Sequence, residues 1–241
     1  MHAIILAGGK GLRLRELTHS SPKGLLSIGS YAMIDHIIYH LAMHGLESVT
    51  IAAGYRCEDY QAHFAQVDGA VLPVQVIDTG HEVDTGGRLK RLAKTVFAKL
   101  DNSEPVFLCW SDGLSDLDVS AMIAQHKASS HLVTLAAVHP PARFGDLQIE
   151  DDLVLSFAEK QKQTDRWING GYFVIEPSVL SYINGDNSSW ERDVLSTLST
   201  QGKLGAYRHN GDWACMDTLH EHAELNRMVN SGKAFWPTPK N

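Results

Sequence analysis

Short apolar runs alternate along the first half of the chain with segments whose apolar residues recur every three or four positions. The runs consist mainly of aliphatic residues and are bounded by turn residues, so they predict buried strands. The first run ends directly at Gly8-Gly9, which indicates a tight turn. We expect strands at Ala3–Ala7, Ser48–Ala53, Val74–Ile77, Val106–Trp110 and Leu132–Val138.

The segments between these runs have helical spacing. The clearest one follows Ser30, a candidate N-cap, and Gly45 closes it. Because strands and helices alternate, this half of the chain predicts a Rossmann-like, doubly wound α/β fold with a mostly parallel sheet. Further helices are expected at Glu58–Phe64, Leu89–Val96 and Asp118–Ser129.

The pattern changes in the second half, where short turns link successive strands. Such short links favour antiparallel pairing, so the sheet is expected to be mixed, with an elaborated C-terminal half. We see no linker, repeat or low-complexity segment, and we expect a single domain over residues 1–241. Strands are expected at Asp146–Ile149, Leu153–Ala158 and Gly171–Ile175, and helices at Trp190–Thr200 and Thr218–Ser231.

Composition narrows the class of protein. The chain has 241 residues and a formal net charge of −7, so no overall basic field would attract nucleic acid, although a local basic pocket for a phosphorylated small molecule is compatible with it. No apolar stretch approaches the length needed to span a membrane. We therefore expect neither a nucleic acid nor a membrane as partner.

Cysteines and histidines give no metal signature. Three cysteines without CxxC-type spacing make a disulfide framework or a zinc site a poor fit, and reduced thiols suit the cytoplasm. His36, His40 and His44 repeat every four residues and could share a helix face. With no Cys or carboxylate cluster beside them, a solvated face is the better interpretation than a metal site.

A glycine-rich turn follows the first strand. Leu6-Ala7-Gly8-Gly9-Lys10-Gly11-Leu12-Arg13-Leu14 holds three glycines that let the backbone approach a ligand, and Lys10, Arg13 and the nearby Lys23 add positive charge. An ordinary strand-to-helix turn is the alternative, but the basic side chains favour a phosphate site. A dinucleotide fingerprint would need glycine where Leu14 stands, and no Walker A sequence occurs.

This turn, followed by Pro22-Lys23, resembles the sugar-1-phosphate nucleotidyltransferase family. Further segments along nearly the whole chain carry the resemblance, and Thr85–Arg91 and Trp213–Thr218 are similar to the cytidylyltransferase branch in particular. The resemblance implies formation of an NDP-sugar, CDP-glucose first of all, and pyrophosphate from CTP and glucose 1-phosphate, with Mg²⁺ as cofactor. The segments are Asp78-Thr79-Gly80, Thr85–Arg91, Asp112-Gly113, Arg143–Gly145, Glu159-Lys160, Ile168–Gly171 and Met216–Thr218.

The resemblance also implies a role for each site residue. Arg13, Lys23, Asp112 and Lys160 would be the catalytic residues. Arg13 and Lys23 would bind the NTP phosphates, and Lys160 would bind the acceptor phosphate. Asp112 and Asp217 would hold Mg²⁺. The nucleotide would contact Ala7, Gly8, Gly9, Gly11, Gly86, Gly87 and Arg88, and the sugar phosphate Gly145, Glu159, Lys160, Asn169 and Gly170.

Each of these residues has a plainer interpretation. Asp112-Gly113 could be a turn, Asp217 a helix N-cap and Gly170-Gly171 a β-bulge. Lys23 and Lys160 could be surface lysines, and Gly86-Gly87 could merely begin a helix. Their joint order and spacing favours the site.

Three alternatives to CDP-glucose synthesis remain. One is the same chemistry on another phosphorylated acceptor or with another NTP. A second is a nucleotide-sugar-binding regulatory module without catalysis, against which the presence of Lys23, Asp112, Lys160 and Asp217 argues. A dehydrogenase is a distant third. The expected partners are the two small-molecule substrates, and a homo-oligomer stays open because the sequence does not set the oligomeric state.

Overall fold

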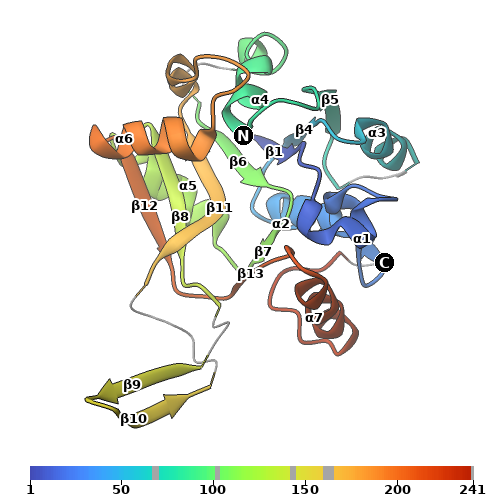
Figure 1. The fold of residues 1–241 in the computed structure, drawn as a ribbon. Helices are drawn as coiled ribbons and strands as arrows, with labels where there is room; N and C mark the ends of the chain where they lie inside the picture. Colours follow the sequence, from blue (N-terminus) through green and yellow to red (C-terminus); the bar gives the residue numbers. More distant parts are fainter. Residues whose placement is uncertain (67–70, 101–103, 142–144, 160–165, 240–241) are drawn as a thin grey trace.

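The computed structural model describes residues 1–241 apart from 67–70, 101–103, 142–144, 160–165 and 240–241 (Figure 1). Its strands are β1 (His2–Ala7), β2 (Ser27–Ile28), β3 (Tyr31–Ala32), β4 (Ser48–Ala53), β5 (Val74–Asp78), β6 (Val106–Trp110), β7 (Gly113–Ser115), β8 (Val133–Val138), β9 (Asp146–Glu150), β10 (Leu153–Ala158), β11 (Ile168–Ile175), β12 (Leu204–His209) and β13 (Trp213–Cys215).

Helices connect most of these strands. The α-helices are α1 (Arg15–Thr18), α2 (Met33–Met43), α3 (Cys57–Gln66), α4 (Thr85–Arg91), α5 (Val119–Lys127), α6 (Ser196–Thr200) and α7 (Leu219–Asn230). Short 3₁₀ turns are η1 (Leu12–Leu14), η2 (Lys23–Leu25), η3 (Phe97–Lys99) and η4 (Pro177–Tyr182), and a π-helical segment, η5 (Trp190–Leu195), runs into α6.

The main sheet has seven strands in the order β12-β8-β11-β6-β1-β4-β5. All neighbours are parallel except β11, which runs antiparallel to both β6 and β8. The predicted α/β fold with a mixed, mostly parallel sheet is therefore confirmed. Strand β1 lies between β4 and β6, so its carboxyl end, where the glycine turn begins, lies inside the sheet and not at either outer strand.

Both faces of the sheet are buried, which explains why β1 is apolar at successive positions. Ala3 and Ile5 belong to a core that includes residues of α2, α3, α5 and α7. Ile4 and Leu6 belong to a second core that includes residues of α4, η5 and α6. Since successive side chains of a strand point to opposite faces, the alternation of these residues places one core on each face.

The C-terminal half contains elements that the sequence pattern did not predict. Strand β12 extends the sheet at one edge beside β8, and β13 pairs antiparallel with the three-residue β7. These strands are too short, or too mixed in polarity, to give a periodic signal. The predicted cap Ser30 is also wrong, because it lies in the turn between β2 and β3, and α2 begins at Met33.

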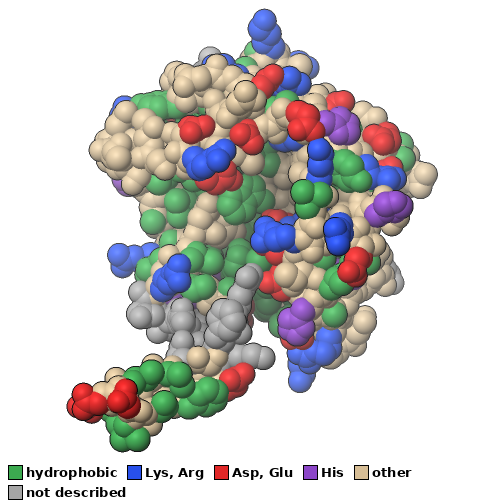
Figure 2. Space-filling model, viewed as in Figure 1, with side chains coloured by type: hydrophobic (Ala, Val, Ile, Leu, Met, Phe, Trp, Pro, Cys, Tyr) green, Lys and Arg blue, Asp and Glu red, His purple; other side chains and the backbone are tan. Residues whose placement is uncertain are grey.

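Strands β9 and β10 form an antiparallel hairpin that projects from the body of the molecule (Figure 1). The antiparallel pairing expected for them is confirmed. Its apolar side chains are at least half exposed, and Figure 2 shows them along the hairpin with acidic side chains at its tip. They are Leu147, Ile149, Leu153, Val154, Leu155 and Phe157.

The repeated histidines of α2 do not form the solvated face that we predicted. His36 and His40 are buried, and Nε2 of each lies 2.9 Å from a backbone carbonyl oxygen, that of Ile28 and that of Leu117 respectively. A neutral imidazole with an N–H at Nε2 satisfies such a carbonyl without carrying charge into the core. Among the residues that the structure describes, no helix has the length and apolar character needed to cross a membrane.

We predict that His40 makes the fold sensitive to mild acid. Burial, reinforced by neighbouring His44, lowers the pKa of His40 to about 4, although the Leu117 carbonyl and Asp116 oppose this shift. An unfolded histidine protonates near its ordinary pKa of about 6.5. Below that pH the unfolded chain binds a proton that the folded protein resists, so stability should fall between about pH 6.5 and pH 4, by at most about 3 kcal/mol from this group.

The measurement is the free energy of urea unfolding from pH 7.5 to pH 4.5. His40→Gln keeps an N–H donor but cannot titrate, so its stability should fall less steeply with pH than that of the unsubstituted protein. The exposed His19 offers a matched control, and His19→Gln should leave the slope unchanged. Equal slopes for His40→Gln and the unsubstituted protein would contradict the prediction.

Candidate active site

A cavity of about 600 Å³ opens at the carboxyl ends of β1 and β6. Ligands of open α/β sheets bind at this edge, where the connections leave the strands. Ten of the residues that the sequence predicted for the site line this cavity. They are Ala7, Gly8, Gly9, Gly11, Arg13, Lys23, Arg88, Asp112, Asn169 and Asp217.

The glycine turn keeps its shape through close contacts with its own protein. The guanidinium of Arg88 donates to the carbonyl oxygen of Gly8 at 3.1 Å, and a Cβ on Gly8 would lie 1.9 Å from Cζ of Arg88. Gly11 has a φ of 61°, a left-handed conformation that glycine adopts without strain. Its carbonyl accepts from the Thr18 hydroxyl at 3.1 Å. The backbone conformation thus favours glycine at Gly11, and the absence of a side chain at Gly8 leaves room for the guanidinium of Arg88.

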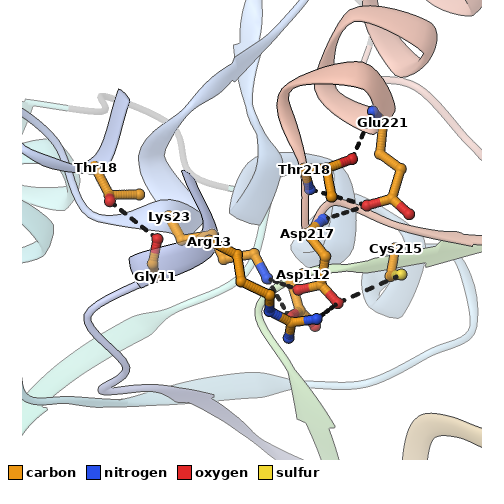
Figure 3. Close-up of polar contacts among 9 residues, drawn as sticks. All are labelled: Gly11, Arg13, Thr18, Lys23, Asp112, Cys215, Asp217, Thr218 and Glu221. Atoms are coloured by element: carbon orange, nitrogen blue, oxygen red, sulfur yellow. Dashed lines mark hydrogen bonds and ion pairs between the residues drawn. The ribbon is translucent and has the colours of Figure 1, made fainter. Parts of the chain in front are cut away.

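Lys23 lies at the start of η2 and is not a surface lysine. Its side chain is 14% exposed, and its Nζ lies 2.6 Å from a carboxylate oxygen of Asp112 and 2.6 Å from one of Asp217 (Figure 3). The backbone behind it packs closely, since a Cβ on Gly24 would lie 2.6 Å from the Tyr60 hydroxyl oxygen. One ammonium group therefore joins two carboxylates from distant parts of the chain.

The two carboxylates meet because β7 pairs with β13. Asp112 directly precedes β7, and Asp217 follows shortly after β13; in this ladder Gly113 lies opposite Cys215. The backbone N–H of Met216 donates to the carbonyl oxygen of Asp112 at 2.9 Å, which extends the pairing by one step. A pair of three-residue strands thus sets the spacing between the two acidic residues.

The start of α7 positions Asp217 further. Thr218 caps the helix by accepting from the backbone N–H of Glu221, and the Glu221 carboxylate accepts from the backbone N–H groups of Thr218 and Asp217, at 2.9 and 2.8 Å (Figure 3). This is a capping box with one extra contact. The alternative that Asp217 itself is the N-cap is wrong, because Thr218 holds that position and leaves the Asp217 carboxylate directed to the cavity residues Arg13 and Lys23.

Charge is balanced within this group of side chains. Burial of Lys23 alone would lower the pKa of its ammonium, but the charges and hydrogen bonds of Asp112 and Asp217 outweigh burial and raise that pKa above its ordinary value. Arg13 adds a second cation, with Nη1 2.8 Å from Asp217, and its side chain is 71% exposed. The partly buried lysine is therefore charged, while the arginine lies at the rim.

The acidic residues fit the expected magnesium ion. Mg²⁺ prefers oxygen ligands and commonly takes one or two protein carboxylates together with substrate phosphate oxygens and water. Asp112 and Asp217 both reach one nitrogen atom, so a single cation could contact both. In the part of the chain that the structure describes, no cluster of three or more His, Cys, Asp or Glu side chains could hold a metal ion. The remaining ligands of such an ion would come from substrate and water.

The residues predicted for the sugar are only partly brought together. Asn169 lines the cavity, and its amide oxygen accepts from the backbone N–H of Gly171 at 2.9 Å. The carbonyl of Gly170 accepts from the Trp213 indole N–H at 2.8 Å. The plainer interpretation of Gly170-Gly171 as a β-bulge also agrees with the structure, since the register with β8 shifts between Asn169 and Phe173.

Two other predicted sugar contacts lie away from the cavity wall. Gly145 directly precedes β9 and Glu159 directly follows β10, so both are at the inner end of the projecting hairpin. A Cβ on Gly145 would lie 3.0 Å from a Glu159 carboxylate oxygen, which shows that they are neighbours. Lys160, the predicted ligand of the acceptor phosphate, lies outside the described residues.

The geometry does not support the predicted contact of Gly86 and Gly87 with the nucleotide. Both glycines are buried in the first turn of α4 and are not among the described residues that line the cavity. A Cβ on Gly86 would lie 2.7 Å from the carbonyl oxygen of Ser188, and one on Gly87 would lie 2.3 Å from that of Asp186. Their lack of a side chain lets α4 pack against residues 186–190.

Arg88 lies on the cavity wall with its guanidinium committed to the protein. Besides Gly8, it donates to the carbonyl oxygens of Ala53 and Gly80, at 3.2 and 2.7 Å, and to the Thr79 hydroxyl at 2.8 Å. Burial lowers the pKa of this guanidinium. Arg88 therefore joins the ends of β1, β4 and β5 beneath the glycine turn.

Sequence reasoning missed a polar group on the wall formed by α4 and η5. The Glu191 carboxylate lines the cavity and accepts from the hydroxyls of Thr85 and Ser189, at 2.7 and 3.1 Å. Trp110 and Trp213 also line the cavity. A glutamate in the first turn of a helix is common, so nothing in the sequence pattern around Glu191 distinguishes it.

The sequence and the fold are similar to those of known proteins. A family model described as "Nucleotidyl transferase" matches residues 2–218. Glucose-1-phosphate cytidylyltransferase of Salmonella typhi is 39% identical, with 99% of each chain covered. Mannose-1-phosphate guanylyltransferase of Mycobacterium tuberculosis is 32% identical over 98% of this chain and 66% of that protein. HddC from Yersinia pseudotuberculosis has a similar fold, with a TM-score of 0.74, 19% identity, and coverage of 95% of this chain and 99% of that one.

We predict that Gly87 is required for stability. In Gly87→Ala the new Cβ would collide with the Asp186 carbonyl, which belongs to backbone and cannot rotate away. The free energy of unfolding should fall by about 1–3 kcal/mol, the usual cost of overpacking. Gly185 lies in the adjoining loop with open space around it, so Gly185→Ala should change stability by less than about 0.5 kcal/mol. Urea denaturation of both variants measures these free energies of unfolding. Equal stabilities of Gly87→Ala and Gly185→Ala would refute the packing role of Gly87.

Proposed function

This chain belongs to the nucleotidyl transferase family, and from that premise we propose that it joins a sugar 1-phosphate to the nucleoside monophosphate of an NTP and releases pyrophosphate. CTP as donor and glucose 1-phosphate as acceptor are the substrates that we propose. Support comes from the glucose-1-phosphate cytidylyltransferases of Salmonella typhi and Salmonella typhimurium, each 39% identical over 99% of this chain.

One observation carries the proposal. Lys23, Arg13, Asp112 and Asp217 form a single charged group beside the glycine turn, on the wall of one cavity. Transfer of a nucleotidyl group requires two anions to meet, so cations must offset their repulsion and the charge that grows on the α-phosphate. The charged group supplies these cations beside a backbone turn whose N–H groups can donate hydrogen bonds to phosphate oxygens.

The chain's own residues would act mainly by positioning. In the proposed reaction an oxygen of the sugar phosphate attacks the α-phosphorus, the bond to the β-phosphate oxygen breaks, and pyrophosphate leaves with that electron pair. The nucleophile is already ionised, so no general base is needed. Lys23 would bind the α-phosphate, and the exposed Arg13 would bind the phosphates that leave.

Magnesium enters the proposal through Asp112 and Asp217, which would hold it. When bound, Mg²⁺ would supply positive charge to the phosphate oxygens of the NTP. Glu221 would keep Asp217 in place through the backbone contact described above. The presence of both carboxylates argues against a regulatory module that has lost catalysis.

The acceptor would lie near Asn169, whose side chain is on the cavity wall. The Asn169 oxygen is engaged with Gly171, so its amide N–H groups would face sugar hydroxyls or phosphate. Lys160 keeps its predicted role at the acceptor phosphate as part of the proposal. We also propose a cytoplasmic enzyme, since Cys57, Cys109 and Cys215 are free thiols, as expected in a reducing compartment.

We predict a preference for pyrimidine triphosphates. Pyrophosphate release should be measured for CTP, UTP, ATP and GTP with glucose 1-phosphate, and the kcat/KM values compared. CTP should exceed UTP by about ten- to hundredfold, because the two bases differ by one or two hydrogen-bonding groups. ATP and GTP should be poor substrates. Efficient use of GTP would move the chain towards guanylyltransferases such as the Mycobacterium tuberculosis relative, and no release with any NTP and sugar phosphate would overturn the proposal.

We predict that the two aspartates act as one unit. Asp112→Asn and Asp217→Asn should each lower kcat by at least about a hundredfold, because either change dismantles the proposed metal site. The double variant should be little worse than each single variant, since residues that serve one site are not additive. Steady-state kinetics at saturating Mg²⁺ tests this, with circular dichroism as the folding control. Near-normal turnover of Asp217→Asn would remove Asp217 from the site.

A further inference from the structure

The ammonium of Lys23 occupies the position between the two carboxylates that would hold magnesium. Each of its two contacts, to Asp112 and to Asp217, is 2.6 Å long. The three side chains are 14%, 25% and 15% exposed, so water screens them only partly. The lysine ammonium thus already occupies the place where the proposed reaction needs a magnesium ion.

Two carboxylates at this distance need a counter-cation. Without one, like charges in a partly buried site repel, and the ionised pair becomes costly. Arg13 contacts Asp217 from the rim, but it is largely exposed and does not pair with Asp112 in the part of the chain that the structure describes. Among the described residues, Lys23 is therefore the cation that contacts both carboxylates at once.

We propose that Lys23 acts in the ligand-free protein as an internal counter-cation, which weakens binding of a free divalent ion to Asp112 and Asp217 until an NTP draws the lysine away. This inference rests on the proposed function, because it assumes that these aspartates are the metal ligands. It adds an order of events, in which the metal ion joins the carboxylates together with the nucleotide.

Charge makes the exchange possible. A triphosphate offers the ammonium of Lys23 new anionic partners, and its oxygens also complete the ligands of a magnesium ion. Lysine suits this role because it is a compact point charge on a flexible stem, so it can change partners without moving the backbone. The backbone beside the stem packs closely at Gly24, against the Tyr60 hydroxyl, so the amine can change partners while the backbone stays in place.

The exchange also has a thermodynamic consequence. If the nucleotide removes the competitor of the metal, nucleotide and metal each strengthen the binding of the other by the same factor. Free metal at ordinary concentrations would then leave the empty site in its lysine-bound form. A lysine that serves only the α-phosphate would give no such change in the affinity of the empty protein for metal.

The test measures binding of Mn²⁺ alone to the ligand-free protein by electron paramagnetic resonance. Lys23→Met keeps the apolar stem and removes the charge, so it should bind Mn²⁺ at least about tenfold more tightly than the unsubstituted protein, since two charge-assisted hydrogen bonds no longer compete. Lys23→Arg keeps a cation and should stay weak. Lys90 donates to the Leu180 carbonyl on another surface, and Lys90→Met controls for the loss of one positive charge.

Thermal unfolding gives a second reading that also checks the fold. Lys23→Met should melt at a lower temperature than the unsubstituted protein without metal, and Mn²⁺ should raise its melting temperature by more. Asp112→Asn introduced into Lys23→Met should abolish both the tighter Mn²⁺ binding and the larger rise in melting temperature that Mn²⁺ causes. Unchanged Mn²⁺ affinity in a folded Lys23→Met protein, or equal tightening in Lys90→Met, would overturn the counter-cation role.

The outcome separates this inference from the proposed function. Nucleotidyl transfer by the unsubstituted enzyme is assayed independently and does not depend on whether Lys23 competes with metal. Transfer activity with no gain in Mn²⁺ affinity for Lys23→Met would reject the inference and leave the function standing. A clear gain in affinity without transfer by the unsubstituted protein would support the exchange and reject the function.

Discussion

The ammonium of Lys23 joins three segments that are far apart along the chain. Its partners Asp112 and Asp217 are 89 and 194 residues away, and each is carried by a different turn at the edge of the sheet. Such a partly buried group is stable only when every charge in it has a partner. The glycine turn, the β7–β13 ladder and the start of α7 must therefore all be in place before the site exists.

Close packing of side chains against glycine supports this arrangement. Arg88 occupies the space that a Cβ on Gly8 would take, and the Trp110 ring does the same at Gly171, where a Cβ would lie 2.4 Å from the ring. Gly24 gives room to the Tyr60 hydroxyl in the same way. These contacts pack closely around the backbone that carries the charged side chains, whereas the Arg13 side chain is 71% exposed at the rim.

The structure separates two uses of glycine that look alike in the sequence. Gly8 and Gly11 shape the turn at the cavity, whereas Gly86 and Gly87 allow a helix to approach a neighbouring loop. In both places glycine indicates that another group lies close to the backbone. The sequence does not say whether that group belongs to a ligand or to the protein itself. The buried histidines of α2 show the same ambiguity, because helical spacing fixes a common face but not what covers it.

The sequence by itself determined the layers of the fold and the inventory of charged groups. Alternating apolar runs and helical segments set a doubly wound sheet, because each strand must bury both faces. The glycine turn with Lys10, Arg13 and Lys23 indicated a phosphate site, and the family resemblance added Asp112 and Asp217 as metal ligands. Only the tertiary structure decided which groups meet. The three-residue strands β7 and β13 carry too little periodic signal to predict, yet their pairing brings the aspartates to one lysine. Contacts between residues distant in sequence arise from packing of the whole chain, and local pattern does not encode them.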